Sequence, residues 1–354
     1  MDGIMNKKNI INRIKRLLSN QKVIEYKNIF ETLEDLKSLH SFYNYTRPAS
    51  WPVIDENIFE AVGLGNSFCN FMPMSTMPYF FRGQTKDYNS CIPAIYRASN
   101  NNDIDIFINR LRSIEFEMIL KKHPAVIDLN KTKGYDCYTK VDFTGLAQHY
   151  GLLTDCLDIT DNFYIAAFFA CCEYDKDTDR YIPKTESGEG IIYFISSLIM
   201  EEDDNFGIVG LQPFHRPAEQ RAFRYKLNKG DNLAKNDLVK ILKFTQTPEG
   251  SKYLYQIFNN GKKLFPYDML KNKVEEIKAT NIFSKKAFLE TYKRYIFTKH
   301  KDYYLNKLRE RNIILEKNTI LQFNSEEIKN LNKVWKKKKK HFFNNTGHRR
   351  VIYP

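Results

Sequence analysis

The sequence lacks the patterns that mark metal sites, disulfide frameworks and membrane spans. It contains 6 cysteines, no two of them in a Cys-x-x-Cys pair, and only His149 lies near one, shortly before Cys156. A zinc site and a disulfide framework are therefore disfavoured, and we expect no bound metal. No stretch approaches the roughly eighteen consecutive apolar residues of a membrane helix. The first twenty residues scatter lysines and arginines where a signal peptide has an apolar core, so we expect a cytoplasmic protein without a membrane partner.

Apolar and aromatic residues are abundant. Hydrophobic residues make up 42% of the 354 residues and aromatic residues 14%, enough for a substantial core, which excludes a disordered chain. The length favours one main domain with an appended second unit.

Charge is unevenly distributed. Residues 1–225 contain 25 Lys and Arg against 30 Asp and Glu, so the net charge of +13 comes from residues 226–354, which contain 30 against 12. A genome-wide lysine bias would not leave the first part acidic. The asymmetry therefore predicts a surface for a polyanion, most commonly a nucleic acid.

The N-terminal quarter reads as helical and then irregular. Apolar residues three and four positions apart predict helices over 7–19 and 25–43. Several prolines and glycines predict a loop or insertion over 44–78. The aromatic run that ends at Gly83 predicts a short strand whose end closely approaches another group, with Arg82 pointing away from Phe81.

The rest of the chain alternates helices with a few strands. Gly151, Asn162, Ser284 and Ser325 are predicted helix caps. We expect strands over 190–196 and 221–227, and helices over 104–122, 143–150, 161–174, 266–279, 284–311 and 325–340.

An ordered set of short motifs resembles the FRG domain, a bacterial family named for its Phe-Arg-Gly motif. Each motif alone is unspecific, but their order is specific, and the resemblance covers about residues 79–270. The chain departs from the family at Asp155, Cys156 and Ile159, where Arg, Leu and Trp are usual. The matching pieces are Phe81-Arg82-Gly83-Gln84, Ile92 to Arg97, Leu146 to Leu152, Thr154, Leu157-Asp158, Thr160, Asn162 and Ala166 to Ala170, with weaker matches at Arg216, Gln220 and 264–266.

A remoter similarity connects the same segments with the ADP-ribosyltransferase superfamily. There, the arginine of an aromatic-Arg-Gly strand contacts NAD. The similarity implies catalytic roles for Arg82, His149 and Glu219. It also implies that the cofactor contacts Phe81, Gly83, Gln84, Asp158, Thr160, Arg216 and Gln220.

The chemistry fits those roles. Cleavage of the nicotinamide–ribose bond develops positive charge on the sugar, so a nearby carboxylate favours the transition state over the ground state. An arginine grips a diphosphate in a planar, bidentate way.

Several residues have competing structural explanations. Residues 216–220 resemble the arginine-to-glutamate spacing of the DNA-modifying ADP-ribosyltransferase toxins. That spacing puts the carboxylate at Gln220, and Glu219 is one residue out of register. His149 is either a base or a residue that satisfies carbonyls at a helix end. Asp158 and Thr160 are either ligand contacts or helix caps. Arg82 binds either Asp158 or a diphosphate.

The basic C-terminal end contains a lysine run interleaved with aromatic residues. Lys336, Lys337, Lys338, Lys339 and Lys340 follow Trp335 and precede Phe342, Phe343, Arg349 and Arg350. Cations mixed with stacking groups suit a single-stranded or irregular nucleic acid, and an acidic protein is the main alternative partner.

The sequence therefore predicts an α+β protein with a small split β-sheet flanked by helices, resembling an ADP-ribosyltransferase, and a basic helical C-terminal unit. The expected regions are 1–78 (helices and loop), 79–279 (FRG domain) and 280–354 (basic and helical). The leading hypothesis is an NAD-using effector that modifies a nucleic acid or protein, as in a toxin or anti-phage defence system. The alternative is a non-catalytic module that binds a nucleotide or nucleic acid and acts by recruitment.

Overall fold

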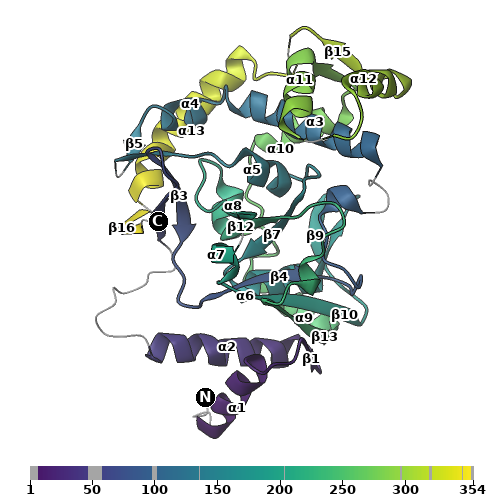
Figure 1. Cartoon of the computed structure of the whole chain (residues 1–354). Helices are drawn as coiled ribbons and strands as arrows, with labels where there is room; N and C mark the ends of the chain where they lie inside the picture. Colours follow the sequence, from purple (N-terminus) through teal and green to yellow (C-terminus); the bar gives the residue numbers. More distant parts are fainter. Residues whose placement is uncertain are drawn as a thin grey trace.

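The computed structural model describes residues 7–46, 58–97, 102–134, 136–202, 204–295, 297–318, 321–344 and 346–351. Within these residues, helices surround a seven-stranded sheet and a separate five-stranded sheet (Figure 1). The predicted α+β class is confirmed. No helix in the described residues is long and apolar enough to cross a bilayer.

The seven-stranded sheet positions the candidate site. Its neighbouring strands are antiparallel, except that the first two are parallel. In order across the sheet they are β1 (Val23–Tyr26), β13 (Val239–Gln246), β10 (Gly188–Ser196), β4 (Tyr79–Gln84), β7 (Cys156–Thr160), β12 (Ala222–Lys226) and β11 (Phe206–Ile208).

The sheet is weakly joined at its middle. β4 pairs with β10 along its whole length, from Tyr79 to Gln84. On its other side, β4 pairs with β7 only where Phe81 faces Thr160. The two halves of the sheet therefore separate next to Arg82.

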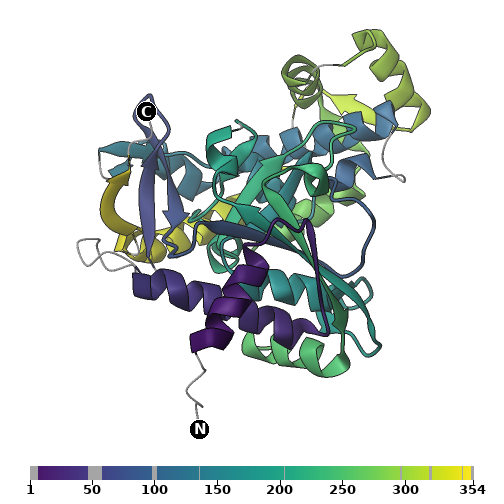
Figure 2. The same cartoon turned by 60° about the horizontal axis from the view of Figure 1, so that its bottom comes forward.

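Four helices cover one face of this sheet: α1 (Lys7–Leu17), α2 (Ile29–Thr46), α6 (Phe163–Cys171) and α9 (Pro248–Ile257). Figure 2 brings α1, α2 and α9 forward beneath the strands. Phe81 is fully buried among them, which anchors β4 against α6.

A second core holds the helical part near the top of Figure 1. Phe107 is at its centre and stacks on Tyr304 with ring centroids 4.6 Å apart. The elements are α3 (Asp103–Leu120), α5 (Phe143–His149), α10 (Leu270–Ala279), α11 (Lys285–Arg294), α12 (Lys301–Glu310), β14 (Ile282–Ser284) and β15 (Ile314–Glu316).

The five-stranded sheet lies beside α4 (Pro124–Leu129) and α13 (Ser325–Asn344). Phe342 of α13 meets Phe71 edge to face. Its strand order is β16 (Thr346–Val351), β2 (Phe59–Gly63), β3 (Phe68–Pro73), β6 (Cys137–Thr139) and β5 (Lys133–Gly134). The remaining elements are β8 (Cys172–Asp175), β9 (Arg180–Pro183), α7 (Ile199–Glu202), α8 (His215–Glu219) and the short 3-10 helices η1 (Ala94–Tyr96) and η3 (Leu233–Lys235).

The predicted loop over 44–78 is wrong for the part that is described. Residues 47–57 lie outside the described residues, but β2 and β3 follow them. The breakers mark strand ends: Gly63 ends β2, Gly65 turns the hairpin with a φ of +79°, and Pro73 ends β3. In this segment proline and glycine therefore mark the ends of strands, and the residues between them are not irregular.

The predicted helix over 284–311 is two helices, α11 and α12. Ser284 caps the first as predicted, accepting from the Ala287 amide at 3.0 Å. The chain then leaves the helix because Phe297 turns into the core against Phe107. Other helix ends also differ. The helix predicted from residue 25 begins at Ile29 because β1 occupies Val23–Tyr26, α10 begins at Leu270 instead of residue 266, and α6 ends at Cys171 because β8 follows.

Candidate functional site

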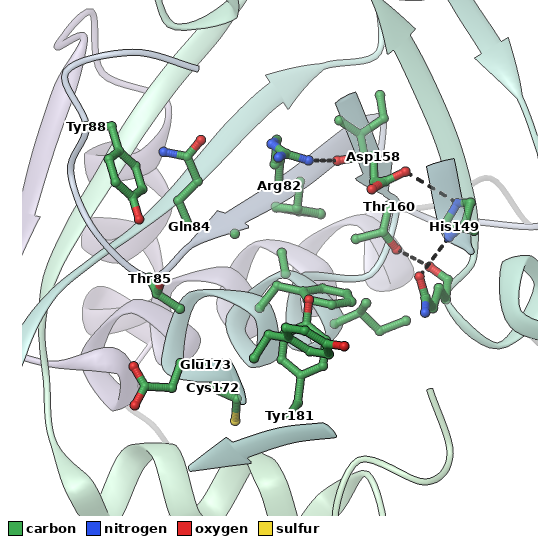
Figure 3. A pocket seen from close by; sticks show the side chains of 18 of the residues that line it. Arg82, Gln84, Thr85, Tyr88, His149, Asp158, Thr160, Cys172, Glu173 and Tyr181 are labelled. Carbon is green, nitrogen blue, oxygen red and sulfur yellow. Dashed lines mark hydrogen bonds and ion pairs between the residues drawn. The ribbon is translucent and has the colours of Figure 1, made fainter. Parts of the chain in front are cut away.

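A cavity of about 270 Å³ opens at the junction of β4 and β7 (Figure 3). Its walls come from β4, β7, α6 and β8, with single residues from α5, from β9 and from the C-terminal cap of α8. In Figure 3, Arg82, Asp158, Thr160 and His149 lie along one side and Glu173, Cys172 and Tyr181 lie across from them. The volume is close to the lower limit for small-molecule sites, about 300 Å³.

Arg82 bridges the gap between the two halves of the sheet. Its Nη1 donates to the backbone carbonyl of Asp158 at 2.6 Å, and its Nε is buried without a hydrogen-bond partner. Arg82 does contact Asp158, but its acceptor is the main-chain carbonyl oxygen and not the side-chain carboxylate. Within the described part of the chain, Arg82 has no carboxylate at ion-pair distance. Its positive charge is therefore not neutralised by an ion pair.

Arg97 brings a second guanidinium to the cavity. It follows η1, and no carboxylate among the described residues lies at ion-pair distance from it either. Part of the side chain reaches solvent, yet crowding by protein atoms lowers the pKa of Arg97, and the charge of Arg82 lowers it further. Two neighbouring cations without a counter-charge make this end of the cavity attractive to an anion.

His149 enters the site with a fixed orientation. The Gln220 side chain donates through Nε2 to the Leu264 carbonyl at 2.9 Å, so its Oε1 is left as an acceptor. That oxygen lies 2.9 Å from His149 Nδ1, which must therefore carry a proton. A neutral His149 consequently presents the lone pair of Nε2.

The Nε2 lone pair faces a carboxylate. His149 Nε2 is 3.6 Å from Asp158 Oδ1, and both atoms are buried without a hydrogen-bond partner. With a neutral imidazole, two acceptors face each other without a donor, which is costly because a buried polar atom normally has a partner. This pair suits a ligand that brings hydroxyl donors.

The other oxygen of Asp158 is held from behind. Gln148 Nε2 donates to Asp158 Oδ2 at 3.1 Å, and Thr154 Oγ1 donates to Gln148 Oε1 at 2.6 Å. The Asp158 side chain is 39% exposed, whereas that of His149 is only 3% exposed. Asp158 is thus an oriented carboxylate that opens onto the cavity. It is a strand residue, so the alternative reading of it as a helix cap is wrong.

Thr160 ends β7 and is buried. Its hydroxyl donates to the Gln220 backbone carbonyl at 2.9 Å. The cap of α6 is Asn162, as predicted, which accepts from the amides of Tyr164 and Ile165. Thr160 therefore links β7 to the residue that orients His149.

Eight of the ten residues expected to be catalytic or to bind the cofactor line this cavity: Phe81, Arg82, Gly83, Gln84, His149, Asp158, Thr160 and Gln220. Arg216 and Glu219 do not. Arg216 lies behind the site, over the ring of Tyr150 at 4.7 Å, and its Nη1 donates to the His149 carbonyl. Glu219 ends α8 outside the lining, and burial raises the pKa of its carboxyl group.

Gly83 is required by the fold. A Cβ added there would come within 1.9 Å of the Ala166 carbonyl oxygen on α6. The expectation that the backbone approaches another group at this strand end is correct, but the group is a helix backbone. The glycine lets α6 lie directly on β4 and so fixes one wall of the cavity.

An aromatic wall and two further polar residues line the cavity but were not predicted from the sequence. Tyr181 lines the cavity and stacks on Phe265 with ring centroids 4.8 Å apart. Burial, and then the charge of Asp158, raises the pKa of Tyr181 to about 12, which keeps its hydroxyl protonated as a donor. Arg97 and Glu173 were also missed. A signal existed only for Arg97, which ends the Ile92 to Arg97 motif.

The lysine run lies on α13, away from this cavity. Trp335 and Phe342 are buried in the core, with Trp335 Nε1 donating to Asp128 Oδ2 at 2.7 Å. The prediction that these aromatic residues are available for stacking on bases is therefore wrong. Lys338 and Lys339 contact His215 and Asp128, whereas Lys336, Lys337 and Lys340 are exposed. The side chains of Arg349 and Arg350 lie outside the described part of the structure.

All six cysteines are buried free thiols. Cys172 lines the cavity, and burial raises the pKa of its thiol to about 12. Among the described residues, no group of three or more His, Cys, Asp or Glu side chains is arranged to hold a metal ion.

Comparison with known proteins supports part of the resemblance. Residues 77–179 match the family model of the FRG domain. No curated protein and no solved structure matches the chain. The matched segment contains Arg82, Arg97, His149 and Asp158, whereas Gln220 lies beyond it. Over residues 77–179 the chain is therefore similar to the FRG domain.

Proposed function

We propose that this cavity binds NAD and cleaves the bond between nicotinamide and ribose, transferring ADP-ribose to water or to an acceptor molecule. One observation carries the proposal. Two arginines without carboxylate partners and an unsatisfied carboxylate–imidazole pair line the same cavity. An anionic group and a sugar are what these two ends would bind.

The arginine end suits the pyrophosphate. Arg82 has a buried, unpartnered Nε, and Arg97 lies close enough for the two charges to affect each other. A pyrophosphate would neutralise both and supply acceptors for guanidinium donors. Because Arg82 is already fixed by its bond to the Asp158 carbonyl, little side-chain entropy is lost on binding.

The His149–Asp158 end suits a ribose. A ribose hydroxyl can donate to Oδ1 of Asp158, and the hydroxyl of the attacking water or acceptor can donate to Nε2 of His149. The enclosed volume of about 270 Å³ fits the nicotinamide riboside half of NAD better than the whole dinucleotide. The adenosine half would then extend past the rim, where Tyr88 is 57% exposed and available for stacking.

The reaction is a substitution at the ribose C1′ atom. The C1′–N bond breaks, and its electron pair passes to the pyridinium nitrogen, so that neutral nicotinamide leaves. Positive charge develops on the ribose and is stabilised by the Asp158 carboxylate, which takes the part that the sequence suggested for Glu219. A hydroxyl oxygen of water or of the acceptor then bonds to C1′ and loses its proton, which His149 Nε2 can accept.

Incubation of the protein with NAD tests the proposal. We expect nicotinamide release, measured by chromatography, that falls at least a hundredfold in Arg82→Ala. Arg309→Ala is the matched control, because Arg309 is an exposed arginine on α12 whose side chain contacts only Asn306 in the described structure. Tight binding of NAD without release would instead favour a non-catalytic nucleotide-binding module. Absence of both binding and release would reject an NAD site.

A further inference from the structure

The lysines of α13 fall into two classes. Trp335 and Phe342 are buried, and Lys338 and Lys339 next to this buried face are engaged with His215 and Asp128. Five others are exposed and, apart from the adjacent pair Lys336 and Lys337, follow one another at spacings of three or four: Lys329, Lys333, Lys336, Lys337 and Lys340. At 100° per residue, these five project from the side opposite the buried face. We call them the lysine stripe.

No lysine of the stripe is neutralised inside the protein. In the described part of the chain, none of them has a carboxylate at ion-pair distance or a hydrogen-bonded side-chain partner. Like charges three and four residues apart destabilise a helix, so the stripe does not serve the stability of α13. The helix is instead held by its buried face, where Trp335 donates to Asp128.

We propose that the lysine stripe binds the phosphate backbone of a nucleic acid without reading its sequence. From Lys329 to Lys340 the helix rises about 16 Å, which along the axis of a duplex corresponds to about five phosphates of one strand. Lysine ammonium groups are flexible point charges that attract phosphates but do not select a base. Because the aromatic residues of α13 are in the core, contacts on this helix are electrostatic and involve no stacking on bases.

The buried face also argues against a membrane as the partner. An amphipathic helix that lies on a bilayer inserts its apolar side among the lipids. On α13 that side already packs against α4 and the five-stranded sheet (Figure 1). Only the charged side remains for a partner. This binding surface is separate from the cavity, and the inference does not depend on cleavage of NAD.

The test measures, by fluorescence anisotropy, how the binding constant for a duplex of about 20 base pairs of random sequence depends on salt concentration. Five phosphate contacts predict a slope of log K against log salt of about −4.5. In the triple variant K336Q/K337Q/K340Q we expect at least tenfold weaker binding and a slope closer to zero by about 3. The three replaced lysines are exposed, so the circular dichroism spectrum of the variant should match that of the unmodified protein.

The matched control removes the same net charge from another helix. Lys285, Lys286 and Lys293 of α11 are also exposed and unpaired among the described residues. The variant K285Q/K286Q/K293Q should keep the affinity and slope of the unmodified protein. An equal loss of affinity in both triple variants would show that net charge alone governs binding, and would overturn the proposal that the lysine stripe binds the backbone. So would the absence of DNA binding at low salt, or binding to phosphatidylserine vesicles without binding to DNA.

Discussion

His149 is oriented before any ligand arrives, and the residue that orients it is far away in the sequence. Gln220 is held by the Leu264 carbonyl and accepts from His149 Nδ1, which leaves Nε2 as the acceptor that faces Asp158. Gln220 therefore acts through His149, as a positioning residue.

Replacing Gln220 with glutamate should change the pH dependence of nicotinamide release. A carboxylate against Nδ1 favours the doubly protonated imidazole, in which Nε2 no longer accepts a proton. We expect the acidic limb of the kcat/KM profile to move about 1 unit toward higher pH. Thr160→Ser, which keeps the hydroxyl that donates to the Gln220 carbonyl, should leave the profile unchanged. A lower rate with an unshifted profile would mean that Gln220 has only a structural role.

At the scale of elements, the cavity depends on how closely α6 lies on β4. Gly83 makes this approach possible, because any side chain there would enter the backbone of α6. The first residue after β7 acts in the same region: Asp161 accepts from Arg221 Nε at 2.6 Å, and Arg221 also donates to the Met74 carbonyl. These contacts tie the half of the sheet that contains β7 and β12 to the end of β3 in the five-stranded sheet.

Gly83→Ala should therefore destabilise the protein strongly. The new methyl group would have to displace the Ala166 carbonyl, and we expect a loss of about 3 kcal/mol or more in the free energy of unfolding. Gly63→Ala is the control, because a Cβ at Gly63 meets nothing within 4 Å. Urea titrations of both variants make the comparison. Equal stability of the two variants would contradict the packing of α6 on β4.

His123 makes the start of α4 sensitive to pH. Its Nδ1 accepts from the Ala125 amide at 3.1 Å, and burial lowers the pKa of His123 to about 4, against the opposite effect of Asp268. The unfolded chain takes up this proton first, near pH 6.5. The contribution of His123 to the free energy of unfolding is therefore constant above pH 6.5 and falls as the pH drops from about 6.5 to about 4.

Between pH 7 and pH 5 this histidine should account for a loss of about 2 kcal/mol in unfolding free energy. His123→Asn keeps an acceptor for the Ala125 amide and cannot titrate, so urea titrations of this variant should show a smaller loss by about that amount. His300→Asn, which caps α12 at an exposed position, is the control. An identical pH dependence in His123→Asn and the unmodified protein would contradict a neutral, buried His123.

For the whole molecule, an occupied cavity should stabilise the fold by linkage. ADP-ribose carries the pyrophosphate and ribose but has no nicotinamide to release. At a hundred times its Kd, a ligand of the folded state adds about 2.7 kcal/mol, which should raise Tm by roughly 2 °C or more in a protein of this size. The rise should vanish in Arg82→Ala. A rise of the same size in that variant would place the ligand elsewhere.

Much of the architecture could be predicted from local signals, and the rest depended on contacts between distant segments. The strand at Arg82, the helix of His149 and the caps at Asn162 and Ser284 follow from short patterns. β2 and β3 were missed because prolines and glycines at strand ends were interpreted as a loop.

The choice between Glu219 and Gln220 is the clearest limit of sequence reasoning at the site. It depends on a single residue at the end of α8, where Arg221 adopts a φ of +47° and Gln220 is the residue that lines the cavity. Spacing alone does not reveal such a turn. Arg97 was overlooked because its significance lies in its proximity to Arg82, which belongs to a different segment.

In the proposed reaction, the Asp158 carboxylate is the group that turns a nucleotide-binding cavity into a catalytic one. The most direct test compares nicotinamide release from NAD by the unmodified protein and by Asp158→Asn, in which an amide oxygen can still accept from Gln148. We expect Asp158→Asn to retain NAD affinity within a few fold and to lose at least a hundredfold in the rate of release. An unchanged rate of release in Asp158→Asn would contradict this role of the carboxylate.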